Sequence, residues 1–243
     1  MEQTPADPFA IVTTTAGAVS ILCREVNEIM HNPVGPWAEA NALYAVPSRL
    51  AEKLREGHGD LVVYDVGLGA AANALAALTL AREIRGPRRL HLISFERDLR
   101  LLEFALEHAA EFAHFHGFEK AIRTLLDERV FEEPGIRWEL HEGEFLEVLD
   151  VVNPAPANLI FFDPYSPKKN SDMWTPEAFA KLRAKCDNER GALLMTYSRA
   201  TPIRVALLQA GFFVGAGAGT GLKDETTQAA TTPTLLSKVL GKE

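Results

Sequence analysis

An aspartate, a proline and a tyrosine follow directly after an apolar run, at Asp163, Pro164 and Tyr165. The run, residues 159–162, reads Leu-Ile-Phe-Phe, which is typical of a parallel strand buried on both faces. Open α/β sheets bind ligands beyond the carboxyl ends of such strands. Asp163 and the Pro164 carbonyl can accept hydrogen bonds from an amine, and the Tyr165 ring can lie against a planar group. The pattern therefore suits an amine substrate; an Asx-type turn that only ends the strand is the alternative.

A glycine turn follows a second apolar strand. Residues 61–66 predict that strand, with Asp65 near its end, and Gly67 and Gly69 form the turn. An alanine-rich helix is expected over residues 70–85. Because glycine has no side chain, the backbone can pass close to a ligand at the helix N-terminus. The turn is thus a candidate cofactor site.

Two acidic residues stand at the ends of neighbouring elements. The strand predicted over residues 90–96 ends at Glu96, whose carboxylate could accept hydrogen bonds from both hydroxyls of a ribose. The strand predicted over residues 136–141 leads to Glu144, which could accept an adenine amino group. The alternatives are a surface carboxylate for Glu96 and helix capping for Glu144.

Two chemistries compete for this arrangement. A nicotinamide dehydrogenase would use Gly67, Gly69 and Ala72 as its phosphate turn and Glu96 for the ribose. An S-adenosylmethionine methyltransferase would use the same turn for the methionine end of its cofactor and the same glutamate for the ribose. The amine-type site at Asp163 favours methyl transfer, and no His-Asp or Tyr-Lys pair is evidently placed for hydride chemistry.

The bulk composition limits the classes of protein. The chain has 243 residues, 47% of them hydrophobic, enough for a full core. No apolar run reaches about 18 residues and the acidic N-terminus lacks the basic start of a signal peptide, so we expect a cytoplasmic protein without membrane segments. A net charge of −8 argues against non-specific coating of nucleic acid. Cys23 and Cys186 lie far apart and predict no metal site.

The alternation of strands and helices predicts a doubly wound, Rossmann-like α/β sheet. We expect one domain over residues 1–243, in which residues 1–57 form an N-terminal extension and residues 58–243 the core. The extension is predicted to hold a β-hairpin and a covering helix. The expected hairpin strands are 9–13 and 18–22, and the expected helices include 37–55, 99–117, 119–129, 144–149 and those that begin at Thr175 and Thr201.

Residues 162–175, Phe-Asp-Pro-Tyr-Ser-Pro-Lys-Lys-Asn-Ser-Asp-Met-Trp-Thr, resemble the strand-and-loop signature of the MnmC-like methyltransferases. That family usually has Asp-Gly-Phe followed by Ala-Pro-x-Lys-Asn-Pro. Residues 91–96 are similar to its second strand, and residues 65–69, Tyr197 and residues 210–212 also resemble it. The sequence differs at Asp-Pro-Tyr, at Asp65-Val66-Gly67 where Glu-Thr-Gly is usual, and at residues 221–225, which carry acids instead of a basic run.

The resemblance implies a class I S-adenosylmethionine methyltransferase fold with a mostly parallel, seven-stranded sheet. It implies methylation of the aminomethyl group of wobble 5-aminomethyl-2-thiouridine in tRNA, without an oxidase domain and with a possible separate oxidase partner. Another amine, on a small molecule or a protein, is the alternative acceptor. The predicted site residues are Asp163 and Tyr165 for catalysis; Asp65, Gly67, Gly69, Glu96, Glu144 and Asp163 for the cofactor; and His31, Lys168, Lys169, Trp174 and Tyr197 for the substrate.

Overall fold

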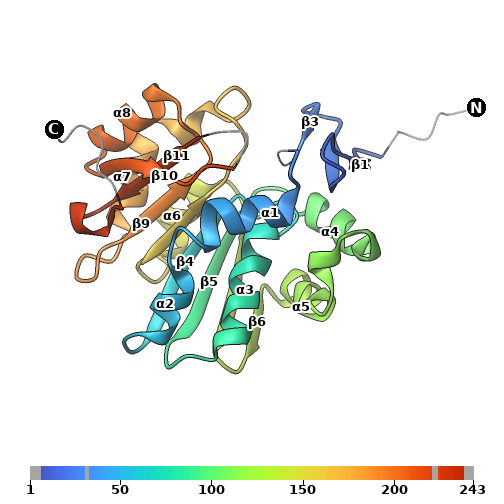
Figure 1. The fold of residues 1–243 in the computed structure, drawn as a ribbon, viewed down its shortest axis with the longest axis horizontal. Coiled ribbons are helices and arrows are strands. Elements are labelled where there is room, and N and C mark those ends of the chain that lie inside the picture. Colours follow the sequence, from blue (N-terminus) through green and yellow to red (C-terminus); the bar gives the residue numbers. More distant parts are fainter. Residues whose placement is uncertain (1–6, 31–32, 221–223, 238–243) are drawn as a thin grey trace, which may run out of the picture.

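The computed structural model describes residues 7–30, 33–220 and 224–237 (Figure 1). Within these ranges, a central sheet of eight strands has the order β10-β11-β9-β8-β4-β5-β7-β6. The four pairings from β9 to β7 are parallel, whereas β6 and β11 run antiparallel to their neighbours. The strands are β4 Asp60–Val66, β5 Arg89–Glu96, β6 Val130–Glu133, β7 Ile136–Glu142, β8 Leu159–Phe162, β9 Leu193–Thr196, β10 Phe213–Gly217 and β11 Thr226–Ala230.

The predicted doubly wound, mostly parallel sheet is confirmed, but its predicted number of seven strands is wrong for the described residues. The additional strand is β6, which pairs with β7 across a turn at Pro134 and Gly135. An edge strand pairs on one side only, and β6 is at most partly buried. It therefore lacks the long apolar run by which the sequence marked the central strands.

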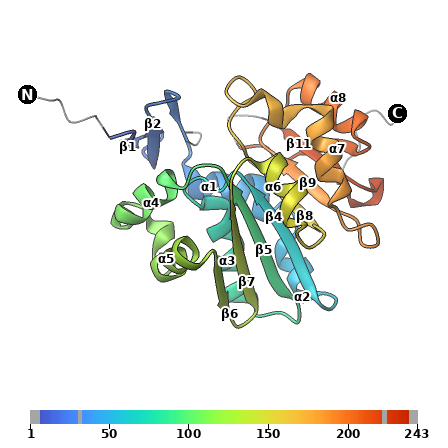
Figure 2. The same cartoon turned by 180° about the vertical axis from the view of Figure 1, so that it is seen from behind.

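Helices cover both faces of the sheet, as the two opposite views show (Figures 1 and 2). Side chains of α2, α3, α4 and α5 share one buried cluster with the sheet, and those of α6, α7 and α8 share another on the opposite face. The central strands are therefore buried on both sides. The helices are α1 Pro36–Ala40, α2 Leu50–Arg55, α3 Ala72–Ile84, α4 Arg100–Glu107, α5 Glu119–Glu128, α6 Phe145–Val152, α7 Pro176–Ala184 and α8 Thr201–Gln209.

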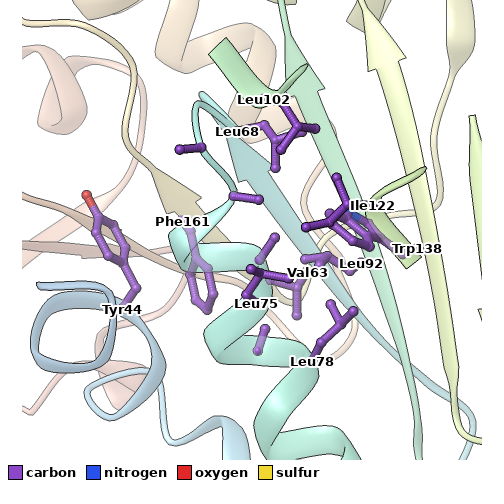
Figure 3. Close-up of a cluster of buried hydrophobic side chains, with 14 of the residues drawn as sticks. Tyr44, Val63, Leu68, Leu75, Leu78, Leu92, Leu102, Ile122, Trp138 and Phe161 are labelled. Carbon is purple, nitrogen blue, oxygen red and sulfur yellow. The ribbon is translucent and has the colours of Figure 1, made fainter. Parts of the chain in front are cut away.

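The core on the α3 face consists of aliphatic and aromatic side chains from facing layers (Figure 3). Val63 and Leu92 of the sheet meet Leu75 of α3, and each of these side chains is completely buried. Tyr44 lies at one side of this cluster, beside Phe161 of β8. Close packing here fixes the relative height of α3 and the strands, and thus the position of the turn that joins them.

The N-terminal residues form a small sheet of their own. The predicted hairpin is confirmed as β1 Phe9–Thr13 and β2 Val19–Cys23, which pair antiparallel. A short third strand, β3 Glu28–Ile29, pairs with β2 and was not predicted. Ring contact between Phe9 and Phe104 of α4 joins this sheet to the core.

The covering helix predicted over residues 37–55 is interrupted. Its first part, α1, continues as a π-helical turn, Asn41–Ala45, and Arg49 then takes a left-handed conformation with φ 55° before α2 begins. Pro47 lies in the interruption. A proline has no N–H to donate to the preceding turn and its ring collides with that turn, so the helix cannot continue through it. The prediction of one continuous helix over residues 37–55 is therefore wrong at Pro47.

The helix predicted over residues 99–117 ends earlier, at Glu107. Two 3₁₀ turns, Ala109–Glu111 and Ala113–Phe115, follow it. Phe112 and Phe115, three residues apart, are both buried in the core. Phe112 is extended between the two turns, and this break in the helix accompanies the burial of both rings.

No helix in the described part of the chain is long and apolar enough to cross a membrane. Among the same residues, no group of three or more His, Cys, Asp or Glu side chains is arranged to hold a metal ion.

Candidate active site

A cavity of about 380 Å³ opens beyond the carboxyl ends of β4, β5 and β8. Residues of the N-terminal sheet, including Glu28 and Met30, form its opposite wall. The position agrees with the general location of ligand sites in open α/β sheets. The lining includes Gly67, Gly69, Asn73, Glu96, Arg97, Glu144, Asp163, Pro164, Tyr165 and Tyr197, together with Glu25, Glu28, Glu39, Asp98, Asn170 and Met173.

The glycine turn after β4 passes against the end of β8. Gly67 has φ +88°, and a Cβ atom at this position would lie 2.6 Å from the Asp163 carbonyl oxygen. The Gly67 N–H donates to the Phe95 carbonyl at 3.0 Å. A side chain would both strain the backbone and collide with the neighbouring chain. Glycine is therefore required for the turn and Asp163 to share the cavity wall.

Glu96 is tied to the same turn. One carboxylate oxygen, Oε2, accepts from the Gly69 N–H at 2.9 Å, and Oε1 accepts from the N–H groups of Arg97 at 2.8 Å and Asp98 at 3.1 Å. Burial raises the pKa of Glu96, while these backbone donors act to lower it. Oε2 has a single backbone donor and keeps a second lone pair, so the group can also accept from a ligand.

Glu144 lines the same cavity from the start of α6. It occupies the N-cap position, but its side chain makes no capping hydrogen bond. Its carboxylate lies 3.4 Å from the Arg97 guanidinium, and about half of each side chain is exposed. The Glu144 side chain therefore makes no capping hydrogen bond, and the interaction of its charge with the α6 dipole stays the alternative to a contact with adenine.

Asp163 is held by a residue that the sequence analysis missed. Asn73, in the first turn of α3, donates from Nδ2 to Asp163 Oδ2 at 2.8 Å. The backbone N–H of Asp163 donates to the Val66 carbonyl at 2.9 Å. Asn73 is 7% exposed, so the bond forms in a largely dehydrated position. In the sequence, Asn73 is a polar residue within the alanine-rich run after the glycine turn, and this exception could have identified it as a site residue.

Tyr44 is a second missed residue. It is 1% exposed, and its hydroxyl lies within hydrogen-bonding reach of the Asp163 side chain. Figure 3 shows this hydroxyl directed toward the carboxyl ends of the strands. Burial first, and then the nearby Asp163 carboxylate, raise the pKa of the Tyr44 phenol well above its ordinary value. Tyr44 therefore remains protonated beside Asp163.

Aromatic side chains surround the Asp163-Pro164-Tyr165 segment. The Tyr165 hydroxyl faces Met30 Sδ at 3.8 Å, and the Tyr197 hydroxyl donates to the Pro164 carbonyl at 3.2 Å. The Trp174 indole N–H donates to the Tyr165 carbonyl at 3.0 Å. Trp174 is buried and lies behind the segment, not among the lining residues. It supports the backbone of the segment.

Other predicted site residues lie elsewhere. Asp65 is fully buried beneath the cavity, where the Ser94 hydroxyl donates to its Oδ2 at 2.8 Å. Burial raises the pKa of Asp65 to about 8, against the Ser94 hydrogen bond, which lowers it. Lys168 and Lys169 are exposed on the loop after β8 and do not line the cavity. His31 lies outside the described residues.

Comparison with known proteins places the chain in a family. Residues 111–232, half of the chain, match the family model described as S-adenosyl-L-methionine-dependent methyltransferase. The chain belongs to this family. Membership favours methyl transfer over the dehydrogenase alternative and identifies S-adenosylmethionine as the cofactor.

Two relatives confirm the predicted resemblance to MnmC. The tRNA 5-methylaminomethyl-2-thiouridine biosynthesis bifunctional protein MnmC of Pseudomonas putida (strain W619) is 30% identical over 198 residues, which cover 77% of this chain and 30% of that protein. The protein of the same name from Methylibium petroleiphilum is 27% identical over 244 residues, covering 96% and 36%. The chain thus spans about a third of the length of these curated relatives.

A solved structure shares the fold. The crystal structure of MNMC2 from Aquifex aeolicus matches with a TM-score of 0.75 and 24% sequence identity, covering 94% of this chain and 72% of that one. This likeness confirms the predicted class I methyltransferase architecture.

The cavity fits S-adenosylmethionine on observations of its own. Gly67 has no side chain, so the backbone of the turn stays accessible where a Cβ atom would collide with Asp163. Glu96 presents a carboxylate of the kind that accepts ribose hydroxyls, next to that turn. A sulfonium is a cation, and most charged residues of the lining are acidic.

Proposed function

We propose that this chain transfers the methyl group of S-adenosylmethionine to the aminomethyl group of wobble 5-aminomethyl-2-thiouridine in tRNA. The observation that carries the proposal is the Asp163 carboxylate, which is held by Asn73 at the wall of the cavity that contains the glycine turn and Glu96. The names of the MnmC relatives support the choice of acceptor.

The charge of the cavity supports an amine as acceptor. Its described lining contains the acidic residues Glu25, Glu28, Glu39, Glu96, Asp98, Glu144 and Asp163, and Arg97 as its basic residue. Such a lining attracts cations. Both the sulfonium cofactor and an amine that arrives protonated meet this requirement, whereas a phosphate group would be repelled from the interior.

We assign the cofactor to the glycine side of the cavity. Gly67 and Gly69 would contact its amino-acid part, Glu96 the ribose hydroxyls, and Glu144 the adenine amino group. An amine that arrives protonated first releases one proton to solvent. S-adenosylmethionine, when bound, supplies a methyl group that the neutral nitrogen can then attack, and S-adenosylhomocysteine leaves. Asp65, which the sequence analysis assigned to the cofactor, would act only from beneath the turn, because it does not reach the lining.

Asp163 is the proposed catalytic residue. Its carboxylate would accept an N–H of the amine, orient the nitrogen lone pair and stabilise the positive charge that forms on the nitrogen. The Tyr165 ring would lie against the uracil ring, and Tyr197 would hold the Pro164 carbonyl in place. Correct placement of the reacting atoms can contribute up to roughly 7–11 kcal/mol to the rate enhancement.

The proposal extends to the organisation of the chain. Residues 1–57 and 58–243 would act as one methyltransferase domain, because the N-terminal sheet supplies one wall of the cavity. Lys168 and Lys169 would then contact the tRNA outside the cavity, and His31 stays a proposed substrate contact. Work on tRNA would place the protein in the cytoplasm, and a separate oxidase would prepare its substrate.

The test is a methyl-transfer assay with purified protein, S-adenosylmethionine and tRNA that carries the unmethylated aminomethyl nucleoside. Mass spectrometry of the digested tRNA should show the gain of one methyl group on that nucleoside. If the protein binds S-adenosylmethionine but the nucleoside gains no methyl group, the acceptor is a different amine, on a small molecule or a protein. The acidic lining of the cavity would still indicate that this acceptor is a cation in solution.

A further inference from the structure

Two side chains approach Asp163 from different elements. Asn73 belongs to α3 and Tyr44 to the π-helical turn that follows α1. We infer that Asn73 and Tyr44 are positioning residues, which hold the Asp163 carboxylate in the orientation that receives the acceptor amine. The inference rests on the proposed amine methylation, because it concerns the same carboxylate.

Asn73 fixes one carboxylate oxygen. Its Nδ2 donates to Asp163 Oδ2 at 2.8 Å, a good distance for a bond to a charged acceptor. Since the two oxygens of a carboxylate are rigidly connected, fixing Oδ2 also restricts where Oδ1 lies. The Asn73 backbone is set by α3, whose first turn is completely packed against the core. The donor therefore sits on a rigid element, as a positioning group requires.

Tyr44 supplies a second polar group at the same place. Its ring packs against Phe161 of β8 at 5.6 Å between ring centres, two residues before Asp163. Its hydroxyl is buried and directed toward the carboxyl ends of the strands (Figure 3). The Asp163 charge contributes to the raised pKa of this phenol, so the hydroxyl lies within electrostatic reach of the carboxylate. A protonated phenol can donate to the carboxylate when the amine binds.

The local backbone supports a functional role for Tyr44. It lies in a π-helical turn, closed by the bond from the Val46 N–H to the Asn41 carbonyl at 3.1 Å. Such turns are rare and are frequent at functional sites. The Tyr44 hydroxyl also interacts with the Asp163 carboxylate, a contact that phenylalanine could not make at this position.

The experiment compares Asn73→Leu and Tyr44→Phe with the wild-type chain in single-turnover methyl transfer. We expect the rate of transfer to fall about 10- to 100-fold in each variant, by analogy with groups that orient a ligand or catalytic side chain. The affinity for S-adenosylmethionine and the KM for the acceptor should change less than about twofold. If Asn73→Leu does not fold, Asn73→Ser replaces it in the comparison, because serine is small and its hydroxyl avoids burying an apolar side chain at this polar position.

Tyr64→Phe is the matched control. Tyr64 is also a buried tyrosine of the sheet region, but its hydroxyl donates to the Ala155 carbonyl at 2.8 Å on the opposite face. This variant should transfer methyl groups at the wild-type rate. Equal losses in Tyr44→Phe and Tyr64→Phe would overturn the inference, because they would reflect a general packing effect.

A double-mutant cycle tests the coupling to Asp163 directly. If Asn73 and Tyr44 act through the carboxylate, Asn73→Leu and Tyr44→Phe should slow the residual transfer of an Asp163→Asn chain less than about twofold. Full, multiplicative losses in that background would overturn the inference.

A measurement without acceptor separates this inference from the proposed substrate. In the protein alone, ¹³C NMR of the Asp163 carboxyl should show a titration midpoint at higher pH in Asn73→Leu, because a lost donor disfavours the charged form. Among the described residues, the groups that interact electrostatically with Asp163 include Tyr44, Asp65 and Tyr197, with Glu39 near both tyrosines. An unchanged midpoint would contradict the inference, whereas inactivity of the wild-type chain toward tRNA would contradict only the proposed acceptor.

Discussion

The Glu96 carboxylate accepts a hydrogen bond from the backbone N–H of Gly69 at 2.9 Å. This bond joins the end of β5 to the turn after β4, so the proposed ribose acceptor and the proposed methionine cradle form one unit. The same carboxylate also holds the first residues after its own strand, through Arg97 and Asp98. The cofactor side of the cavity is thus organised before the cofactor binds.

Glu96→Gln should weaken S-adenosylmethionine binding at least about 10-fold, or about 1.4 kcal/mol, because a neutral amide accepts ribose hydroxyls less strongly than a carboxylate. Isothermal titration calorimetry measures the affinity. Glu142→Gln is the control: Glu142 ends the next strand, β7, and pairs with Arg129 at 2.7 Å on the surface. If Glu96→Gln and Glu142→Gln bind S-adenosylmethionine with equal affinity, the assignment of Glu96 to the cofactor site is wrong.

Gly67→Ala should destabilise the fold and abolish cofactor binding. The added Cβ atom would lie 2.6 Å from the Asp163 carbonyl oxygen at a φ of +88°. Gly211→Ala provides a matched control, since Gly211 has the same φ of +88° but no atom within 4 Å of the added Cβ. Both variants incur the strain of a positive φ, of order 1 kcal/mol. Thermal unfolding should show the larger decrease in Tm for Gly67→Ala; equal decreases would mean that the close approach is unimportant.

Tyr165→Phe should keep near-normal methyl transfer, because the hydroxyl interacts with two sulfur atoms, Met30 Sδ at 3.8 Å and the Cys23 thiol, which are weak hydrogen-bond partners. Tyr165→Ala should raise the acceptor KM by roughly 5- to 100-fold, since stacking of a base on an aromatic ring contributes about 1–3 kcal/mol. Steady-state kinetics with tRNA distinguish the two. A normal KM in the alanine variant would show that the ring does not contact the acceptor.

The buried Asp65 should make stability depend on pH. Burial raises its pKa to about 8, so between about pH 4 and pH 8 the folded chain holds a proton that the unfolded chain releases. Its contribution to stability is therefore complete below about pH 4 and is lost as the pH rises toward 8. The wild-type chain should therefore lose free energy of unfolding between pH 5 and pH 8. In Asp65→Asn, which cannot ionise at this position, that loss should be smaller by more than about 1 kcal/mol.

Urea unfolding at the two pH values measures this difference. Asp150→Asn serves as control, because Asp150 is 59% exposed and forms a surface pair with Lys181. The same pH dependence in wild type and Asp65→Asn would contradict the assignment of Asp65 as a neutral buried acid.

The sequence predicted much of the cavity because parallel strands end at one edge of a sheet. Gly67, Glu96 and Asp163 come from three strands, and the apolar runs before them were sufficient to place them together. Each of these strands is a short, mostly apolar run with a clear end, so the residue after it can be assigned.

The helical contributions could not be predicted in the same way. Asn73 reaches Asp163 only because the turn before α3 sets the rotation of that helix, which an alanine-rich run does not reveal. Tyr44 depends on a helix that is interrupted near Pro47. Conversely, Lys168 and Trp174 follow a strand end closely, but the path of the loop exposes one and buries the other behind the site.

The central claim is that Asp163 acts chiefly on the acceptor amine, and that the contact with the cofactor predicted for it adds little to cofactor affinity. The most direct measurement is single-turnover methyl transfer by Asp163→Asn, with S-adenosylmethionine affinity measured on the same preparation and Asp150→Asn as control. We predict a rate at least about 100-fold below wild type, with cofactor affinity within about threefold and the control unchanged. Near-normal transfer by Asp163→Asn, at intact cofactor affinity, would contradict the account.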